Sequence, residues 1–160
     1  MTGDFSEPVE RVSAFLRDAG VEARIQEFPD GTHTAQDAAD AVGCDLAQIV
    51  KSLVFMCGER PVVALVPGDR RGDPEKVARA LEASEARVAN TGEVEHATGF
   101  APGAVPPFPL PDVDVVLMDV ALLRHPLVWA GAGSPKHVLG MAPTELARLS
   151  RARPLDISAD

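Results

Sequence analysis

A single lysine interrupts a nearly continuous apolar segment at residues 49–56. Residues 49–56 read IVKSLVFM, and on a β-strand Lys51 would share one face with Leu53 and Phe55. An ammonium group among these side chains has two interpretations. It either lies at a strand end and reaches water along its aliphatic stem, or it is held at the mouth of a pocket, where it can bind an anion or polarise a carbonyl group.

Two short helices are predicted directly before this strand. Thr34 is a typical N-cap for a helix over residues 35–42, and Gly43 is typical of the left-handed residue that ends a helix. Asp45 begins a further helical turn, with Gln48 in the reciprocal position of a capping box. This order of helix, short helix and strand would fix the lysine near the start of its strand.

Residues 34–55, TAQDAADAVGCDLAQIVKSLVF, resemble the signature of the YbaK/EbsC family. Two later stretches match the same family, GAVPPF at 103–108 and HPLVWAGAGSP at 125–135, and the likeness covers about residues 8–150. The family contains free-standing aminoacyl-tRNA deacylases and the editing domain inserted in some bacterial prolyl-tRNA synthetases. The family lysine that matches Lys51 is the residue most tied to activity, which favours the functional interpretation of this side chain.

The resemblance implies hydrolysis of the ester that joins an amino acid to the tRNA 3′ end, with Lys51 and His125 as catalytic residues. Because this ester is activated, the enzyme needs to orient water and stabilise an oxyanion rather than supply a strong nucleophile. Lys51 would stabilise the oxyanion or hold the terminal ribose-phosphate, and both roles stay open. His125 begins a His-Pro-Leu tripeptide that resembles one in deacylases clearing alanine from tRNA for proline. Its imidazole would position water, and the alternative is a partly exposed turn histidine.

Two loops are the expected walls of the substrate site. Glycines let backbone N–H groups approach a ligand closely, and such groups can form an oxyanion hole. The alternatives are a plain turn at residues 131–133 and prolines that merely stiffen the loop at 103–108. The predicted substrate-binding residues are Ser52, Gly103, Val105, Pro106, Phe108, Gly131, Ala132, Gly133 and Ser134. The loop residues are uncharged, which predicts an uncharged aminoacyl group. A small group is expected because synthetases err most among small side chains, and the resemblance implies the same.

Other catalytic chemistries find no support in the sequence. The four histidines and two cysteines do not stand at metal-ligand spacing, and neither cysteine belongs to a C-x-x-C pair. The chain also lacks a G-x-S-x-G elbow and a Walker loop. We therefore expect no metal and no cofactor, and a generic carboxylesterase is a poor alternative because it would lack its nucleophile.

Composition places the chain among single-domain globular proteins. It has 160 residues, of which 46% are hydrophobic and 24% charged, and no apolar run approaches the ~20 residues of a membrane span. The acidic, polar start is unlike a secretory signal, and Cys44 and Cys57 have no framework spacing. We therefore expect a cytoplasmic protein with reduced thiols and no membrane partner. The net charge of −9 argues against tight, non-specific RNA binding.

The spacing of apolar residues and turn residues predicts an α+β fold, because strands fall in hairpin-like neighbours more often than in βαβ alternation. Helices are expected at 6–19, 35–42, 74–81, 90–96 and 143–149, and strands at 21–28, 49–56, 61–66, 86–89, 113–118, 126–130 and 137–141. The resemblance implies a curved, barrel-like, mixed and mostly antiparallel sheet of about six or seven strands with helices packed outside. Residues 1–150 would form the editing domain, and residues 151–160 a loose C-terminal tail.

Together these features predict a free-standing deacylase that clears mischarged tRNA in trans, with the tRNA 3′ end as its partner. The alternative is a non-catalytic binding module of the same fold that captures an aminoacyl or nucleotide group or docks on a synthetase. The acidic surface expected from the composition suits this alternative. The amino acid, the tRNA, the synthetase partner and the oligomeric state, a homodimer among its options, stay open at this stage.

Overall fold

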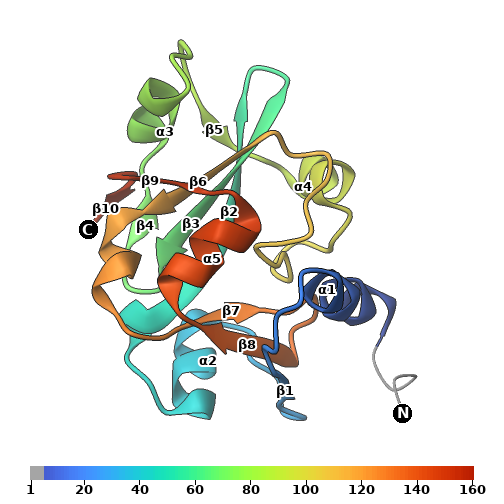
Figure 1. Cartoon of the computed structure of the whole chain (residues 1–160). Helices are drawn as coiled ribbons and strands as arrows, with labels where there is room; N and C mark the ends of the chain where they lie inside the picture. The colour runs from blue at the N-terminus through green and yellow to red at the C-terminus, as the bar shows by residue number, and fades with distance from the viewer. Residues whose placement is uncertain (1–5) are drawn as a thin grey trace.

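A large mixed sheet with helices around it forms the body of the molecule (Figure 1). The computed structural model describes residues 6–160. Within that range the helices are α1 (Glu7–Asp18), α2 (Ala35–Val42), α3 (Pro74–Ala80), α4 (Thr91–Thr98) and α5 (Pro143–Ser150), with 3₁₀ turns η2 (Leu46–Gln48) and η3 (Val120–Arg124). No helix of this part of the chain is long and apolar enough to cross a membrane.

The strands run in the order β1-β8-β7-β2-β3-β6-β9, and β5 pairs with β2 beside this path. Their bounds are β1 (Ile25–Glu27), β2 (Ile49–Cys57), β3 (Arg60–Pro67), β5 (Arg87–Val88), β6 (Val115–Asp119), β7 (Val128–Gly131), β8 (His137–Met141) and β9 (Arg153–Leu155). Antiparallel pairs outnumber parallel ones, and β4 (Arg71–Gly72) with β10 (Ser158–Ala159) forms a separate small sheet. The predicted mixed, mostly antiparallel α+β fold is confirmed; the sheet has eight strands and is not closed.

The β2–β3 hairpin is the centre of the sheet. Its register runs from Val50 opposite Pro67 to Cys57 opposite Arg60. Both faces of the hairpin are covered, which explains why its sequence is nearly continuous in apolar residues rather than alternating. On β3, Val63 and Leu65 belong to one hydrophobic cluster, and their neighbours in sequence belong to another on the opposite face.

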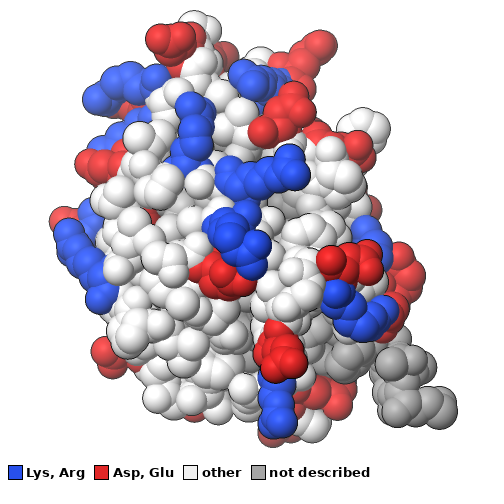
Figure 2. Space-filling view, in the orientation of Figure 1, with Lys and Arg blue, Asp and Glu red and all other residues white. Residues whose placement is uncertain are grey.

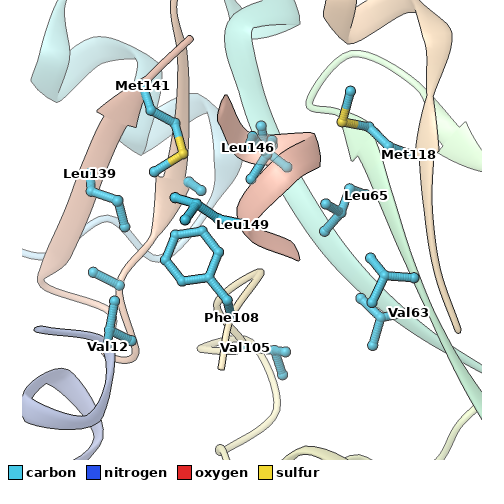
Figure 3. Close-up of a cluster of buried hydrophobic side chains, with 14 of the residues drawn as sticks. Val12, Val63, Leu65, Val105, Phe108, Met118, Leu139, Met141, Leu146 and Leu149 are labelled. Atoms are coloured by element: carbon cyan, nitrogen blue, oxygen red, sulfur yellow. The ribbon is translucent and has the colours of Figure 1, made fainter. Parts of the chain in front are cut away.

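The larger cluster lies between the sheet and helices α1 and α5 (Figure 3). Val12 of α1, Leu146 and Leu149 of α5, and Leu139 of β8 meet there. The Phe108 ring enters the same cluster from the proline-rich loop between α4 and β6, and it stacks on Phe15 with ring centroids 4.9 Å apart. This packing ties the loop to the core, so the loop that precedes β6 has a fixed position.

The predicted helix ends are largely confirmed. The Thr34 hydroxyl accepts a hydrogen bond from the backbone N–H of Asp37, and Gly43 and Gly99 end their helices in the left-handed conformation. Reciprocal capping boxes are present at the start of η2 and of α4. The helix expected at 6–19 begins at Glu7, and the side chain of Ser6 before it makes no capping hydrogen bond.

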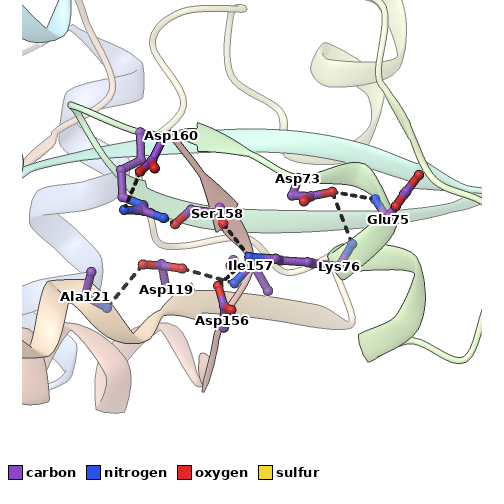
Figure 4. Close-up of polar contacts among 10 residues, drawn as sticks. Asp73, Glu75, Lys76, Asp119, Ala121, Asp156, Ile157, Ser158 and Asp160 are labelled. Atoms are coloured by element: carbon purple, nitrogen blue, oxygen red, sulfur yellow. Dashed lines mark hydrogen bonds and ion pairs between the residues drawn. The ribbon is translucent and has the colours of Figure 1, made fainter.

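The prediction of a loose tail at residues 151–160 is wrong. β9 pairs in parallel with β6, and β10 pairs antiparallel with β4. Ile157 between them is fully buried, and its backbone N–H donates to the Asp119 carboxylate at 3.0 Å (Figure 4). Lys76 of α3 binds both the Asp156 carboxylate and the Ser158 carbonyl. The sequence pattern missed this order because the segment is short and polar and gains its stability from residues far away in the chain.

Candidate functional site

A cavity of about 270 Å³ lies where α2 meets strands β2 and β7. Its walls come from five separate segments of the chain. They are residues 32–35 with Ala38 and Val42 of α2, residues 49–53 of β2, residues 103–105 of the proline-rich loop, residues 129–131 of β7, and Ser134, Pro135 and Val138. The volume lies just below the range of ~300–1,000 Å³ that is usual for drug-sized ligands, so the cavity suits a small group.

Lys51 lies in this cavity between two hydrophobic clusters on the same face of β2. Ile49 on one side packs against α2, and Phe55 on the other packs against α3 and β3. The gap between them leaves the lysine half-buried, and its ammonium donates a hydrogen bond to the Arg70 carbonyl. Burial lowers the pKa of Lys51 from its ordinary value, and the nearby Asp69 carboxylate partly opposes this effect. The side chain is thus fixed in the protein and does not simply extend into water.

The first half of the GAVPPF loop lines the cavity, whereas its second half does not. Gly103 and Val105 contribute to the wall, and Ser52 of β2 lines the same cavity. Pro106 and Phe108 turn away from the cavity, and Phe108 fills the core against α1. The structure therefore does not bring Pro106 and Phe108 to the cavity, and their expected contact with the substrate stays a prediction.

The glycine-rich loop after β7 divides in the same way. Gly131 and Ser134 line the cavity, and a Cβ on Gly131 would meet no atom within 4 Å. Ala132 is fully buried in the core and does not line the cavity. Gly133 has φ +101°, and a Cβ there would lie 2.9 Å from the Pro8 carbonyl oxygen. Gly133 therefore permits the close approach of α1; it does not line the cavity, and its expected contact with the substrate stays a prediction.

His125 lies apart from the cavity. It follows η3, where its backbone N–H donates to the Leu122 carbonyl, and its side chain is half-buried. β7 begins three residues later, and the part of β7 that lines the cavity starts only at Trp129. The structure therefore does not bring His125 together with Lys51, and its expected role in positioning water stays a prediction without geometric support.

A different histidine lies behind the cavity wall. The Ser134 hydroxyl lies 2.6 Å from Nδ1 of the buried His137, whose Nε2 is 3.6 Å from the Glu27 carboxylate. Ser134 also accepts a hydrogen bond from the Lys136 backbone N–H at 3.0 Å. These contacts fix the hydroxyl at the cavity. The sequence interpretation missed His137 because it reads as an ordinary inward residue of a strand.

Trp129 forms a wall that the sequence interpretation also missed. Gly140 lies opposite Trp129 on the adjacent strand β8, and a Cβ on that glycine would lie 3.0–3.1 Å from the indole ring. The absence of a side chain at Gly140 therefore makes room for the indole. Trp129 is the one tryptophan of the chain, which makes its fluorescence a specific reporter for the cavity.

The site offers the Lys51 cation, the His33 imidazole, and hydroxyl and backbone groups around them. Lys51 is the one lysine or arginine among the described residues that line the cavity, and no aspartate or glutamate lines it. Elsewhere in residues 6–160, no cluster of three or more His, Cys, Asp or Glu residues could hold a metal ion. The arrangement can bind and polarise a carbonyl or an anionic group.

Comparison with known proteins finds relatives that cover most of this chain. YwhH of Bacillus subtilis, an uncharacterised protein, is 32% identical over 79% of this chain and 80% of its own length. The proline–tRNA ligase of Thiobacillus denitrificans is 34% identical over 80% of this chain, but the match spans 23% of the ligase. A solved structure of a protein proposed as a trans-editing enzyme for prolyl tRNA synthetase superimposes with a TM-score of 0.91 at 36% identity, covering 98% of this chain and 100% of that one.

The family match covers most of the structure described above. The model of the aminoacyl-tRNA editing domain matches residues 29–149, which include α2, the β2–β3 hairpin and every segment that lines the cavity. The chain therefore belongs to the aminoacyl-tRNA editing domain family.

Proposed function

We propose that this protein is a trans-editing deacylase that hydrolyses mischarged aminoacyl-tRNA carrying a small, uncharged amino acid. The observation that carries the proposal is the Lys51 ammonium, held inside a cavity of about 270 Å³ that no carboxylate of residues 6–160 lines. Water attacks the ester carbonyl, the bond to the ribose oxygen breaks, and free amino acid and tRNA leave. A fixed cation stabilises the negative charge that develops on the carbonyl oxygen during this attack.

Lys51 is the proposed catalytic residue. In a partly water-excluded site a cation acts more strongly on a developing charge than it would in water. The Arg70 carbonyl orients the ammonium and leaves it two further hydrogens for a substrate. The same two hydrogens could instead bind the phosphate next to the terminal ribose, so the oxyanion and ribose-phosphate roles predict different kinetics. A lost oxyanion contact lowers kcat, whereas a lost ground-state contact raises KM.

The remaining wall residues would orient the substrate. The Ser52 and Ser134 hydroxyls can bind the amino group or the attacking water, and Gly103 and Gly131 leave room for the ester beside the backbone. His137 acts through Ser134 as a positioning residue, because it touches the hydroxyl and does not itself line the cavity. Orientation of this kind can supply several kcal/mol of a reaction barrier.

The distribution of charge suits recognition of only the acylated end of tRNA. The net charge is −9, and on the face shown in Figure 2 basic and acidic side chains are interspersed rather than gathered by sign. A protein that grips long stretches of RNA backbone usually has a broad basic face. A deacylase that binds the 3′ end needs few phosphate contacts. The related segments within proline–tRNA ligases suggest that docking on a synthetase is a second way to bring the substrate close.

The decisive experiment measures turnover. Protein at one-hundredth of the concentration of alanyl-tRNA for proline is expected to release alanine through many cycles, and matched reactions without protein give the background. Lys51→Ala protein, checked for folding, is the control. A binding module of the same fold would at most protect the ester, so slower ester loss than in buffer, at stoichiometric protein, would overturn the proposal in favour of the module.

A further inference from the structure

A second hollow adjoins the cavity on the other side of Lys51. This outer groove has a volume of about 460 Å³ and opens toward β4, β5 and α4. Beyond the residues that it shares with the cavity, its principal lining residues are Phe55, Arg71, Val88, Val94 and Pro102. The shared residues are Lys51, Ser52, Leu53, Gly103 and Val105, so the two hollows meet along one short piece of β2 and the tip of one loop.

The two walls of the outer groove are fixed by separate sets of contacts. On one side β4 packs closely against β2, since a Cβ on Gly72 would lie 2.9 Å from the Phe55 ring. The strand β10 pairs with β4 and holds it in place. On the other side β5 pairs with β2, and Arg87 at its start forms a two-pronged ion pair with Glu93 of α4. The groove is therefore a built feature and not a gap between mobile loops.

The surface chemistry of the outer groove is unusual for this protein. Val88 is 68% exposed, the most of any large hydrophobic residue among those that the structure describes, whereas the next is 40% exposed. Arg71 on the rim is exposed, and within the described part of the chain no aspartate or glutamate lines the groove. An apolar surface with one guanidinium at its rim complements a flat, uncharged ring system attached to a phosphate.

The covalent structure of the substrate decides what such a groove receives. If the aminoacyl group occupies the cavity, its ester bond lies at Lys51, and the ribose on the other side of that bond must lie where the two hollows meet. The outer groove is directly continuous with that point, so the base and the phosphate of the same nucleotide fall within it. This step rests on the proposed function.

We propose that the outer groove binds the terminal nucleotide of the tRNA 3′ end, with the base against Val88 and Val94 and its 5′ phosphate paired with Arg71. Ser52, which both hollows share, lies where it can bind a ribose hydroxyl. The two parts of the ligand then bind in the two hollows of the site. The cavity receives the amino acid and the groove receives the nucleotide, with Lys51 between them.

The first test measures binding without catalysis, using adenosine 5′-monophosphate as the probe. In NMR titrations up to ~10 mM, enough to detect a dissociation constant near 1 mM, we expect shifts in the amides of Val88, Ala89 and Val94. Val88→Glu and Arg71→Gln should each weaken binding about fivefold or more. Val120→Glu and Arg60→Gln, at exposed positions outside the groove, are the matched controls and should change nothing.

A second probe separates the two hollows. An analogue of the same nucleotide that carries alanine through a 3′ amide cannot be hydrolysed as an ester. It should shift the groove amides and also change the fluorescence of Trp129 in the cavity, whereas adenosine 5′-monophosphate alone should leave that fluorescence unchanged. Shifts confined to residues outside the groove would overturn the assignment.

Kinetics give the third readout. With aminoacyl-tRNA, Val88→Glu and Arg71→Gln should raise KM at least fivefold and keep kcat within about twofold, because both residues lie away from the ester. Arg71→Gln should also reduce the slope of log KM against log salt by about 0.7, the value for one phosphate on a single strand. If deacylation is observed but these variants leave KM and nucleotide binding unchanged, the groove assignment fails and the proposed function stands. Nucleotide binding in the groove without turnover would leave the assignment intact and overturn the proposed function.

Discussion

The ammonium of Lys51 donates a hydrogen bond to the backbone carbonyl of Arg70, which lies 19 residues away in the turn after β3. Arg70 is itself held, because its guanidinium donates to the Ser158 hydroxyl at 2.7 Å and pairs with the Asp160 carboxylate at 3.0 Å. The last strand of the described chain thereby supports the residue that orients the lysine. The position of Lys51 depends on contacts that are far apart in sequence.

Lys51→Ala is expected to fold and to lose at least about tenfold to a hundredfold in deacylation rate, the scale for removal of an electrostatic stabiliser. Because Lys51 is half-buried and packs between two clusters, its loss should change the melting temperature only slightly. The measurements are single-turnover deacylation and thermal unfolding. Lys136→Ala, an exposed lysine outside the cavity, is the matched control. Full activity in folded Lys51→Ala protein would exclude the proposed mechanism.

The pH dependence follows from the environment of the same lysine. Since burial lowers the pKa of Lys51 from its ordinary value of 10.5, the cation is lost at a pH below 10.5. Activity that depends on the cation should therefore fall on the alkaline side before pH 10.5 is reached. Lys51→Arg, which stays charged, should lack this alkaline decline even if its activity is lower. A rate that keeps rising to pH 10.5 in the wild type, after correction for uncatalysed ester loss, would contradict the role of the cation.

The same shift has a consequence for stability. Where the folded pKa of a lysine lies below its unfolded value, the unfolded chain binds more protons between the two, so folding stability rises with pH across that window. Relative to Lys51→Met, which has no such group, the wild type should gain stability as the pH rises toward 10.5. Urea unfolding of both proteins at several alkaline pH values measures this difference.

Two neighbouring glycines should respond in opposite ways to a valine. Gly131 lines the cavity with no atom near its Cβ position, so Gly131→Val should fill the site, lower activity at least tenfold and leave the melting temperature within about 2 °C. Gly133→Val should destabilise the fold by about 1–3 kcal/mol, because φ is +101° and the Cβ would lie 2.9 Å from the Pro8 oxygen. Thermal unfolding and activity per folded molecule separate the two. Similar melting temperatures for both variants would refute the distinction.

Local signals allowed much of the fold to be predicted from sequence. The helix that starts after Thr34 and ends at Gly43 and the apolar strands at 49–56 and 61–66 depend on residues within a few positions of one another, and all were predicted correctly. The burial of Ile157 could not be predicted in this way. It depends on Asp119 and on β4, which are distant in sequence and leave no periodic pattern in a ten-residue polar segment.

The candidate site shows the same limit. Motifs pointed to the two loops but could not say which of their residues line the cavity. Gly133 serves α1 and Phe108 serves the core, whereas Gly131 and Ser134 line the cavity. His137 was missed because its contact with Ser134 spans a turn whose shape sequence alone does not fix. Residue type thus indicated the region of the site, and tertiary packing decided the roles within it.

The ion pair that fixes one wall of the outer groove should weaken in acid. The Arg87 guanidinium and the Asn90 backbone N–H lower the pKa of Glu93 to about 2 from an ordinary value of 4.5. A carboxylate with a depressed pKa contributes stability that is present above 4.5 and is lost as the pH falls toward about 2. Glu93→Gln keeps an acceptor for the capping box but not the charge.

The wild type should therefore exceed Glu93→Gln in stability at pH 6, and the gap should shrink steadily between pH 4.5 and pH 2. Urea midpoints at pH 6, 4 and 3 measure it. Glu95→Gln, an exposed glutamate on the same helix, serves as the control and should give no comparable gap. A gap of constant size across this range would show that the charge of Glu93 has no part in stabilising the wall.

The cavity should select the aminoacyl group by its size and charge. The cavity is small, at about 270 Å³, and Ala35, Ala38 and Trp129 limit its width. A lysyl or arginyl side chain would bring a second cation beside Lys51 without a carboxylate to pair with it, which is costly in a partly buried site. A tryptophanyl group would have to fit a rigid, bulky ring system between these walls, whereas an alanyl group needs little of the space. Small side chains are also where synthetases most need editing, because one methylene is worth only ~1–3 kcal/mol in a binding pocket.

Rates over a panel of charged tRNAs are therefore expected to be highest for alanine-, serine-, cysteine- and proline-sized esters, and at least about tenfold lower for lysyl, arginyl, aspartyl, glutamyl and tryptophanyl esters. Ala38→Gly, which enlarges the cavity from the α2 side, should raise the rate for larger uncharged groups more than for alanine. The comparison must use one tRNA body with different amino acids, so that only the side chain changes. Equal rates on the alanyl and lysyl forms of that tRNA would show that the cavity does not select the side chain.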